Sequence, residues 1–161
     1  MELLKVAKRR LEEESQRIDY ELRVTLPREI NVALAQGDLS ENAEYEAAKE
    51  RQSTLQGRMA QIHKRLADLS RIDVSGIPRD RAGLGSEVTV ENLDTGEELC
   101  YTLVVPEVAD EGPHFVSIAA PVGQALLNRR IGDNVTVNIP RGTFDLEVRK
   151  IVTAFGDVLG E

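Results

Sequence analysis

The chain has 161 residues and a net charge of −8, with 30% charged and only 4% aromatic side chains. This composition excludes an overall basic surface that coats nucleic acid, and it favours long exposed helices beside one compact module. Cys100 is the only cysteine, which excludes an internal disulfide and a cysteine metal cluster. No stretch approaches the roughly 18 apolar residues of a membrane span, so we expect a cytoplasmic protein without membrane contact.

Residues 3–70 are predicted to form two long helices. Apolar residues of the first helix recur mostly at steps of three and four, at Leu4, Ala7, Leu11, Ile18, Leu22, Leu26, Ile30 and Ala33. The second helix repeats these steps without a break, at Tyr45, Ala48, Gln52, Leu55, Met59, Ile62, Leu66 and Leu69. Both stripes have the width of a heptad seam, which predicts an antiparallel coiled coil about 45 Å long. Pro27 should kink the first helix or weaken one of its turns.

A change of period divides the chain near residue 76. We assign residues 1–75 to the coiled coil, 76–85 to a linker with three glycines and a proline, and 86–161 to a second domain. Alternating apolar residues in the second domain predict an antiparallel sheet with strands at 87–91, 99–105, 114–118, 134–139 and 143–152. One short helix is expected at 121–128.

The predicted fold class is α + α+β, an N-terminal antiparallel two-helix coiled coil followed by a small antiparallel sheet with one short helix. The two parts differ in charge. Residues 1–75 hold 13 Lys and Arg against 14 Asp and Glu, whereas residues 76–161 hold 7 against 14. The acidic part suits a basic protein surface better than phosphate, although the same acidity can serve solubility alone.

The turn between the two helices, residues 36–45, contains the polar segment GDLSENAEY. Gly37 suits the position after a helix end, where a left-handed backbone is needed. Asp38 and Glu41 are three residues apart and can form a capping box at the start of the second helix. The same carboxylates are hard oxygen ligands for Mg²⁺, but two acids on an exposed turn need a partner to complete such a site. Spacing alone favours the capping role and leaves the metal role open.

The segment GDLSENAEYEAAKE, residues 37–50, closely resembles the signature of the GreA/GreB transcript cleavage factors. The chain is also similar to that family's C-terminal pattern, at Pro121, Ala125, Leu126, Gly132, Asp133, Pro140 and Gly142. The resemblance implies the family's fold, an N-terminal antiparallel coiled coil and a C-terminal FKBP-like domain. The near-neutral coiled coil is closer to the GreA branch than to the more basic GreB branch.

The resemblance implies that the chain binds bacterial RNA polymerase as a monomer. The FKBP-like domain would dock at the secondary channel, and the coiled-coil tip would approach the 3′ end of backtracked RNA. Asp38 matches an acid that shares Mg²⁺ with the polymerase, and Glu41 matches an acid that positions or deprotonates the attacking water. The protein would complete the cleavage site of the polymerase, so it would not be an enzyme alone or hold Mg²⁺ by itself.

Further residues match the motifs of the family. Those expected to support the tip are Leu39, Ser40, Asn42 and Tyr45. Ser40 and Asn42 can instead serve only the helix start, and Tyr45 can pack in the seam. Pro121 matches a partner contact, but the preceding Ala119-Ala120 replaces polar residues that are usual in the family.

Other polar side chains have ordinary interpretations. Lys49 and Arg51 could touch RNA phosphate, but a solvated helix face is favoured, and His63 is expected on the surface. Cys100 is expected to fill space in the core. Two rival functions remain: a Gre-fold regulator that inhibits or modulates polymerase without cleavage, and an FKBP-like prolyl isomerase. The second rival needs an aromatic-lined pocket, which the few aromatic residues argue against.

Overall fold

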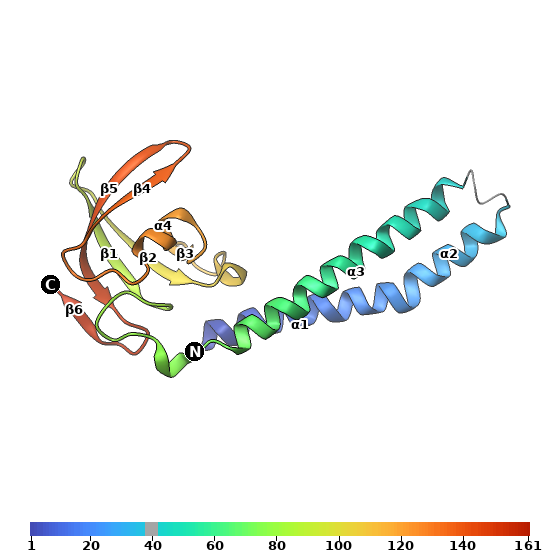
Figure 1. The fold of residues 1–161 in the computed structure, drawn as a ribbon, viewed down its shortest axis with the longest axis horizontal. Coiled ribbons are helices and arrows are strands. Elements are labelled where there is room, and N and C mark those ends of the chain that lie inside the picture. Colours follow the sequence, from blue (N-terminus) through green and yellow to red (C-terminus); the bar gives the residue numbers. More distant parts are fainter. Residues whose placement is uncertain (38–41) are drawn as a thin grey trace. The chain divides into compact units, whose positions relative to one another are not determined.

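The computed structural model describes residues 1–37 and 42–161, which form two compact units. One unit contains Lys8–Ile72, and the other contains Met1–Ala7 together with Asp73–Glu161. Figure 1 shows the helical hairpin of the first unit and the curled sheet of the second. None of the helices in the described residues combines the length and the apolar character that a membrane crossing requires.

The helical hairpin has two antiparallel arms (Figure 1). The elements of the first arm are α1 (Glu2–Tyr20), η1 (Glu21–Thr25) and α2 (Leu26–Ala35), and the second arm is the 28-residue helix α3 (Ala43–Ser70). The buried residues of α3 are spaced by seven, at Ala48, Leu55, Ile62 and Leu69. The predicted pair of helices and the heptad seam of the second helix are therefore confirmed.

The first arm contains one residue more than a regular heptad repeat allows. Leu11 and Ile18 are buried seven residues apart, but the next buried residue, Leu26, follows after eight. One extra residue would rotate an α-helical stripe by about 100° away from the seam. The turn η1 is a π-helix, in which the N–H of Leu26 donates to the carbonyl of Glu21, and such a turn holds one additional residue. The stripe therefore stays buried on both sides of η1.

Pro27 explains why the π-helical turn lies where it does. Proline has no N–H to donate, and its ring crowds the carbonyl four residues earlier, which here belongs to Arg23. The wider turn of a π-helix relieves this crowding immediately before the proline, which stands in the first turn of α2. The weakened turn predicted at Pro27 is confirmed, and it takes the form of η1.

Two bidentate ion pairs between described residues tie the arms together. Arg58 donates to the two carboxylate oxygens of Glu14 at 2.7 and 2.9 Å, and Arg51 donates to those of Glu21 at 3.0 and 3.2 Å. The two glutamates are seven residues apart, and so are the two arginines. The ion pairs therefore repeat once per heptad and match the alignment of the two arms. In each pair the hydrogen bond from the arginine holds the pKa of the glutamate below its ordinary value of 4.5.

Within the described residues 73–161, a six-stranded sheet has the order β3-β2-β1-β5-β4, with β6 paired to β5. The strands are β1 (Glu87–Asn92), β2 (Glu98–Val104), β3 (Phe115–Ser117), β4 (Asn134–Ile139), β5 (Gly142–Val152) and β6 (Val158–Gly160). The first five were predicted. The prediction of a wholly antiparallel sheet is wrong, because β3 pairs with β2 in parallel. The segment between them, which contains the turn η4 (Pro106–Val108), carries the chain back before β3 begins.

The core of the sheet unit lies between the sheet and the short helix α4 (Pro121–Leu126). Its buried residues include Val88, Val90, Leu103, Leu126, Val135, Val137, Leu146, Val148 and Ile151. Gly123 allows α4 to approach the chain after β3, since a Cβ atom there would lie 1.9 Å from the carbonyl oxygen of Ser117. Cys100 is exposed, so its predicted core position is wrong. It occupies the face of β2 opposite to the half-buried Leu99 and Tyr101.

The segment expected to act as a linker, residues 76–85, is hydrogen bonded along the sheet unit. The N–H of Ala82 donates to the carbonyl of Arg129, and its own carbonyl accepts from the N–H of Asn128, both at 2.8 Å. The N–H of Gly85 donates to the carbonyl of Leu103 at 2.7 Å. Ala82 and Gly85 are therefore held within the sheet unit, whose second segment begins at Asp73.

A deletion within η1 tests the extra residue. Removal of the exposed Arg23, combined with Pro27→Ala, should convert η1 to regular α-helix while the seam stays in phase. We expect an unfolding free energy equal to or above that of the wild type, measured by urea denaturation with circular dichroism. Removal of the exposed Gln16 is the matched control. It takes a residue from a regular heptad and should cost at least about 2 kcal/mol. Equal losses from the two deletions would contradict the role given to η1.

The ion pairs predict a pH dependence. Because the folded-state pKa values of Glu14 and Glu21 are lowered, their contribution is complete above the ordinary value of 4.5 and is lost as pH falls through the lower values. The double variant Glu14→Gln/Glu21→Gln should therefore be less stable than the wild type near neutral pH, and the difference should shrink as pH falls below 4.5. Urea midpoints measured across this range check the prediction. Curves that are separated by the same amount at every pH would show that the ionised carboxylates are not the source of the stabilisation, and curves that coincide would show that these pairs do not stabilise the fold.

Candidate functional site at the turn of the helical hairpin

Most predicted site residues fall in the turn between α2 and α3. Asp38, Leu39, Ser40 and Glu41 lie outside the described residues, so the roles assigned to them stay predictions. The structure describes the residues on both sides, Gly37 after α2 and Asn42 before α3. Within residues 1–37 and 42–161, no group of three or more His, Cys, Asp or Glu side chains is placed to hold a metal ion.

The first arm ends in a defined turn. Helix α2 stops at Ala35, and the N–H of Gln36 donates to the carbonyl of Ala33 at 3.2 Å. Gly37 follows with a φ of 117°, a value that side chains rarely tolerate, and no atom lies within 4 Å of where its Cβ would be. The left-handed backbone predicted for this glycine is confirmed, and the backbone rather than crowding is what requires it.

Asn42 connects the two arms through its side-chain amide. Its Oδ1 atom accepts a hydrogen bond from the N–H of Tyr45 at 3.1 Å, which makes Asn42 the N-cap of α3. Its Nδ2 atom donates to the carbonyl of Ala33 at 2.7 Å, near the end of α2. The half-buried side chain of Asn42 therefore accepts from a backbone N–H of the first turn of α3, which has no partner within that helix. It also donates to a carbonyl in the last turn of α2.

This arrangement corrects the predicted helix start. The capping box assigned to Asp38 and Glu41 placed the cap four residues too early, because α3 begins at Ala43 and its cap is Asn42. Asparagine and aspartate are similarly good N-caps, so spacing alone could not choose between them. Of the two roles left open for Asn42, the helix start is confirmed.

Tyr45 also has a structural position. It stands one heptad before Gln52, and both side chains are half-buried. Tyr45 comes three residues before Ala48, the first buried residue of α3. Packing in the seam, one of its two predicted roles, agrees with this burial. Contact of Tyr45 with RNA or polymerase stays a prediction.

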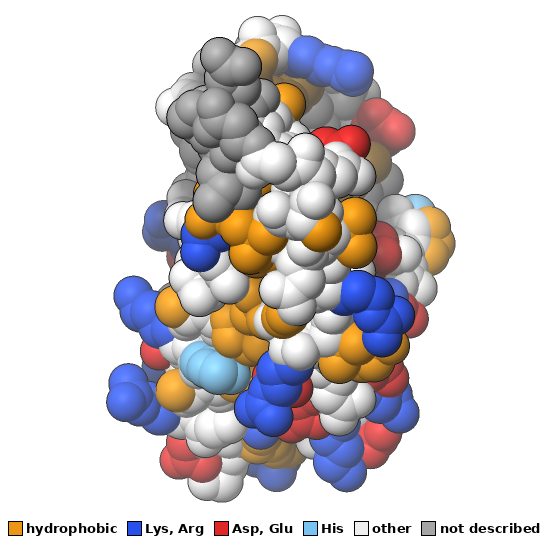
Figure 2. Space-filling model, turned by 90° about the vertical axis from the view of Figure 1, so that its right-hand side faces the viewer, with side chains coloured by type: hydrophobic (Ala, Val, Ile, Leu, Met, Phe, Trp, Pro, Cys, Tyr) orange, Lys and Arg blue, Asp and Glu red, His pale blue; other side chains and the backbone are white. Residues whose placement is uncertain are grey.

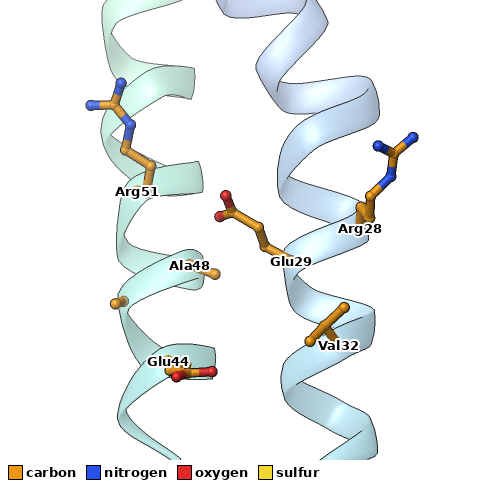
Figure 3. Close-up of a pocket in the computed structure, with 7 residues that line it drawn as sticks. Arg28, Glu29, Val32, Glu44, Ala48 and Arg51 are labelled. Carbon is orange, nitrogen blue, oxygen red and sulfur yellow. The ribbon is translucent and has the colours of Figure 1, made fainter.

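A groove of about 500 Å³ lies between α2 and α3 close to the turn. It is lined by Arg28, Glu29, Val32, Glu44, Ala47, Ala48 and Arg51. Figure 3 shows Arg28, Glu29 and Val32 on α2 opposite Glu44, Ala48 and Arg51 on α3. The apolar part of the groove is formed by Val32, Ala47 and Ala48, and its other lining residues carry charges of both signs. Figure 2 shows that basic and acidic side chains are also mixed over the face drawn there. The groove was not predicted from the sequence. Its lining residues on each helix include pairs three or four positions apart, a spacing that places side chains on one face of a helix and could have indicated a shared surface.

The basic residues of α3 near the turn are already engaged within the protein. Arg51 is paired with Glu21, and the hydrogen bond to that carboxylate raises the pKa of the guanidinium. Lys49 donates to the amide oxygen of Gln52 at 3.0 Å. These contacts agree with the surface interpretation favoured for both residues. His63 is exposed on α3, as predicted.

Pro121 lies in the sheet unit, where it is the exposed first residue of α4. The preceding Ala120 forms the N-cap position without a side-chain hydrogen bond, so the two alanines contribute only backbone hydrogen bonds there. A cavity of about 250 Å³ beside α4 is lined mainly by apolar residues, with Val122, Tyr101 and Phe144 among them. Burial, and secondarily the charge of Glu97, raises the pKa of Tyr101. The cavity is smaller than most ligand sites, and the partner contact of Pro121 stays a prediction.

Comparison with known proteins decides the family. Residues 3–70 match the profile "Transcription elongation factor, N-terminal", and residues 77–153 match "Transcription elongation factor, GreA/GreB, C-term". The chain is 40% identical to transcription elongation factor GreA of Thermodesulfovibrio yellowstonii, over 88% of this chain and 90% of that protein. The chain belongs to the GreA/GreB family. A second GreA, from Nitratidesulfovibrio vulgaris, is 39% identical over 89% of this chain and 87% of its own length.

Solved structures from the family are also similar to the chain. GreA/GreB from Nitrosomonas europaea is 31% identical, with a TM-score of 0.42, and the match covers 56% of this chain and 78% of that one. GreA factor homolog 1 of Thermus thermophilus is 27% identical, with a TM-score of 0.39, over 89% of this chain and 93% of that one. The GreA/GreB assignment stands on the sequence matches. The expected coiled coil followed by a small α+β domain is the fold of this family member.

Two glycine substitutions should have opposite effects on this GreA/GreB family member. Gly37→Ala places a side chain on a left-handed backbone and should lower the unfolding free energy by about 1 kcal/mol. Gly57→Ala falls in the interior of α3, where a Cβ meets nothing within 4 Å, and should raise it by roughly 0.5–1 kcal/mol. Thermal unfolding followed by circular dichroism measures both. Effects of the same sign would contradict the turn geometry at Gly37.

Proposed function

We propose that this GreA/GreB family member stimulates bacterial RNA polymerase to cleave the 3′ end of backtracked RNA. The observation that carries the proposal is the acid pair Asp38 and Glu41 within GDLSENAEY, at the turn of the hairpin, in a chain whose two halves both match the family. The relatives named GreA are transcription elongation factors, which supports the same role here.

The chemistry of the acid pair fits a shared Mg²⁺ site. Carboxylates are the hard oxygen ligands that Mg²⁺ accepts, and this ion commonly takes one or two of them beside water and phosphate. Asp38 would supply a ligand to an ion that the polymerase also holds, and Glu41 would orient or deprotonate the attacking water. When bound, Mg²⁺ would stabilise the charge that develops in phosphoryl transfer. Because two acids do not make a complete site, the chain would not be an enzyme without the polymerase.

The rest of the fold suits delivery of the acid pair. Helix α3 has 28 residues, so the hairpin arm is about 42 Å long, and its seam and ion pairs make it stiff. The sheet unit would provide the docking surface, with Pro121 among its contacts. Residues 76–161 hold twice as many acidic as basic residues, so a basic patch on the polymerase would complement them. A monomer acting in the cytoplasm, where its polymerase works, is the form that we propose.

Removal of one charge from the tip tests the proposal. Asp38→Asn should reduce RNA cleavage in a stalled, backtracked elongation complex by about a hundredfold, because an amide is a poor Mg²⁺ ligand. Binding to polymerase should be unchanged, since the hairpin and the sheet unit are intact. The rate of 3′-end shortening, followed on labelled RNA at several Mg²⁺ concentrations, gives the measurement.

Glu46→Gln is the matched control, because Glu46 is another acid near the turn, in the first turn of α3. It should cleave at the wild-type rate. Near-normal cleavage by Asp38→Asn would refute the assigned role. A wild type that slows elongation without shortening RNA would instead support the rival function, a channel regulator without cleavage. A wild type with neither effect would contradict both.

A further inference from the structure

We propose that Asn42 is a positioning residue, which holds the acidic turn by bridging the ends of α2 and α3. This inference rests on the proposed function, because it concerns how the turn that carries Asp38 and Glu41 is presented to the reaction. It goes beyond N-capping, which needs only one of the two hydrogen bonds that the Asn42 side chain makes.

The bridge depends on the chemistry of a carboxamide. Asn42 accepts from the N–H of Tyr45 through Oδ1 and donates to the carbonyl of Ala33 through Nδ2, at 3.1 and 2.7 Å. The two partners fix which atom is which, since a backbone N–H can only donate and a carbonyl can only accept. Aspartate would keep the cap but has no donor for Ala33. Serine would keep the cap, but its single oxygen cannot lie beside the N–H of Tyr45 and the carbonyl of Ala33 at the same time.

The bond to Ala33 is well placed to persist. The carbonyl of Ala33 accepts from both Gln36 and Asn42, so both of its lone pairs are used. Ala33 is 1% exposed, so its carbonyl belongs to a buried position of the seam. A hydrogen bond in such a setting meets less competition from water than one on an open surface.

The bridge ties together two residues that flank the acids in the chain. Asn42 and Ala33 are nine residues apart, and the acids Asp38 and Glu41 both lie between them. The hydrogen bond between Asn42 and Ala33 removes conformations in which the ends of α2 and α3 are far apart. The loss of chain entropy that this requires occurs when the protein folds. The cost of bringing the two helix ends together is then met before the protein binds the polymerase. Reactions are sensitive to misplacement of about 1 Å, so loss of the bridge should reduce the rate of cleavage.

Substitutions that keep the cap but remove the bridge provide the test. Asn42→Ser and Asn42→Asp should keep the N-cap and the concentration that half-saturates polymerase, and their thermal midpoint should fall only by the loss of one hydrogen bond. The maximal cleavage rate should fall between about tenfold and a hundredfold. Agreement between the neutral and the charged variant excludes an effect of the added charge. Wild-type cleavage by both variants, with a loss only in Asn42→Ala, would show that Asn42 is a cap alone and would overturn the inference.

A second readout needs no polymerase. Backbone ¹⁵N relaxation should give a lower order parameter for Gly37 in Asn42→Ser than in the wild type, with no change at Gly57 in the middle of α3. An unchanged value at Gly37 would overturn the bridge whatever the cleavage assay shows. Failure of the wild type to cleave, combined with the expected change at Gly37, would contradict the proposed function and leave the bridging role of Asn42 supported.

Discussion

The structure of the hairpin depends on keeping one apolar seam in phase along two helices. Each arm contributes a narrow stripe, so a single misplaced residue would turn the stripe toward solvent over the remaining length. The chain meets this constraint at η1, where a π-helical turn absorbs the extra residue between Ile18 and Leu26. The paired glutamates and arginines repeat on the same seven-residue spacing. Seam and charges therefore specify one register, and the register decides which residues reach the turn.

At the turn, structural and chemical demands are divided between different residues. Gly37 supplies the left-handed backbone, and Asn42 caps α3 while bonding the end of α2. The N-cap of α3 therefore does not require an acid. A carboxylate committed to backbone N–H groups would have to share its oxygens with a metal ion, and this conflict is avoided when an amide provides the cap. The division is consistent with a role for Asp38 and Glu41 outside the hairpin itself.

The spacing of apolar residues predicted most of the fold, because helices and strands each bury side chains at a regular interval along the chain. Heptad steps gave α3, and alternation gave five strands in the sheet unit. The parallel pairing of β3 depends on a contact across the crossover before it, which no local pattern encodes. The π-helical turn left a weak trace, since Leu22 lies four residues from both Ile18 and Leu26 where threes and fours should alternate. At the site, the motif GDLSENAEY singled out the acids, but only the structure showed that the N-cap of α3 is Asn42.

The repeat of the two ion pairs has a consequence for the evolution and engineering of arm length. Glu14 and Arg58 stand one heptad from Glu21 and Arg51, so the hairpin is built from interchangeable steps. Adding or removing seven residues in each arm would preserve the seam, the charge pairing and the face on which the turn opens, and would move the turn by about 10 Å. Changes of any other size would rotate it. The reach of the hairpin can therefore change in steps of one heptad, and η1 marks the position in the described first arm where a single extra residue is already accommodated.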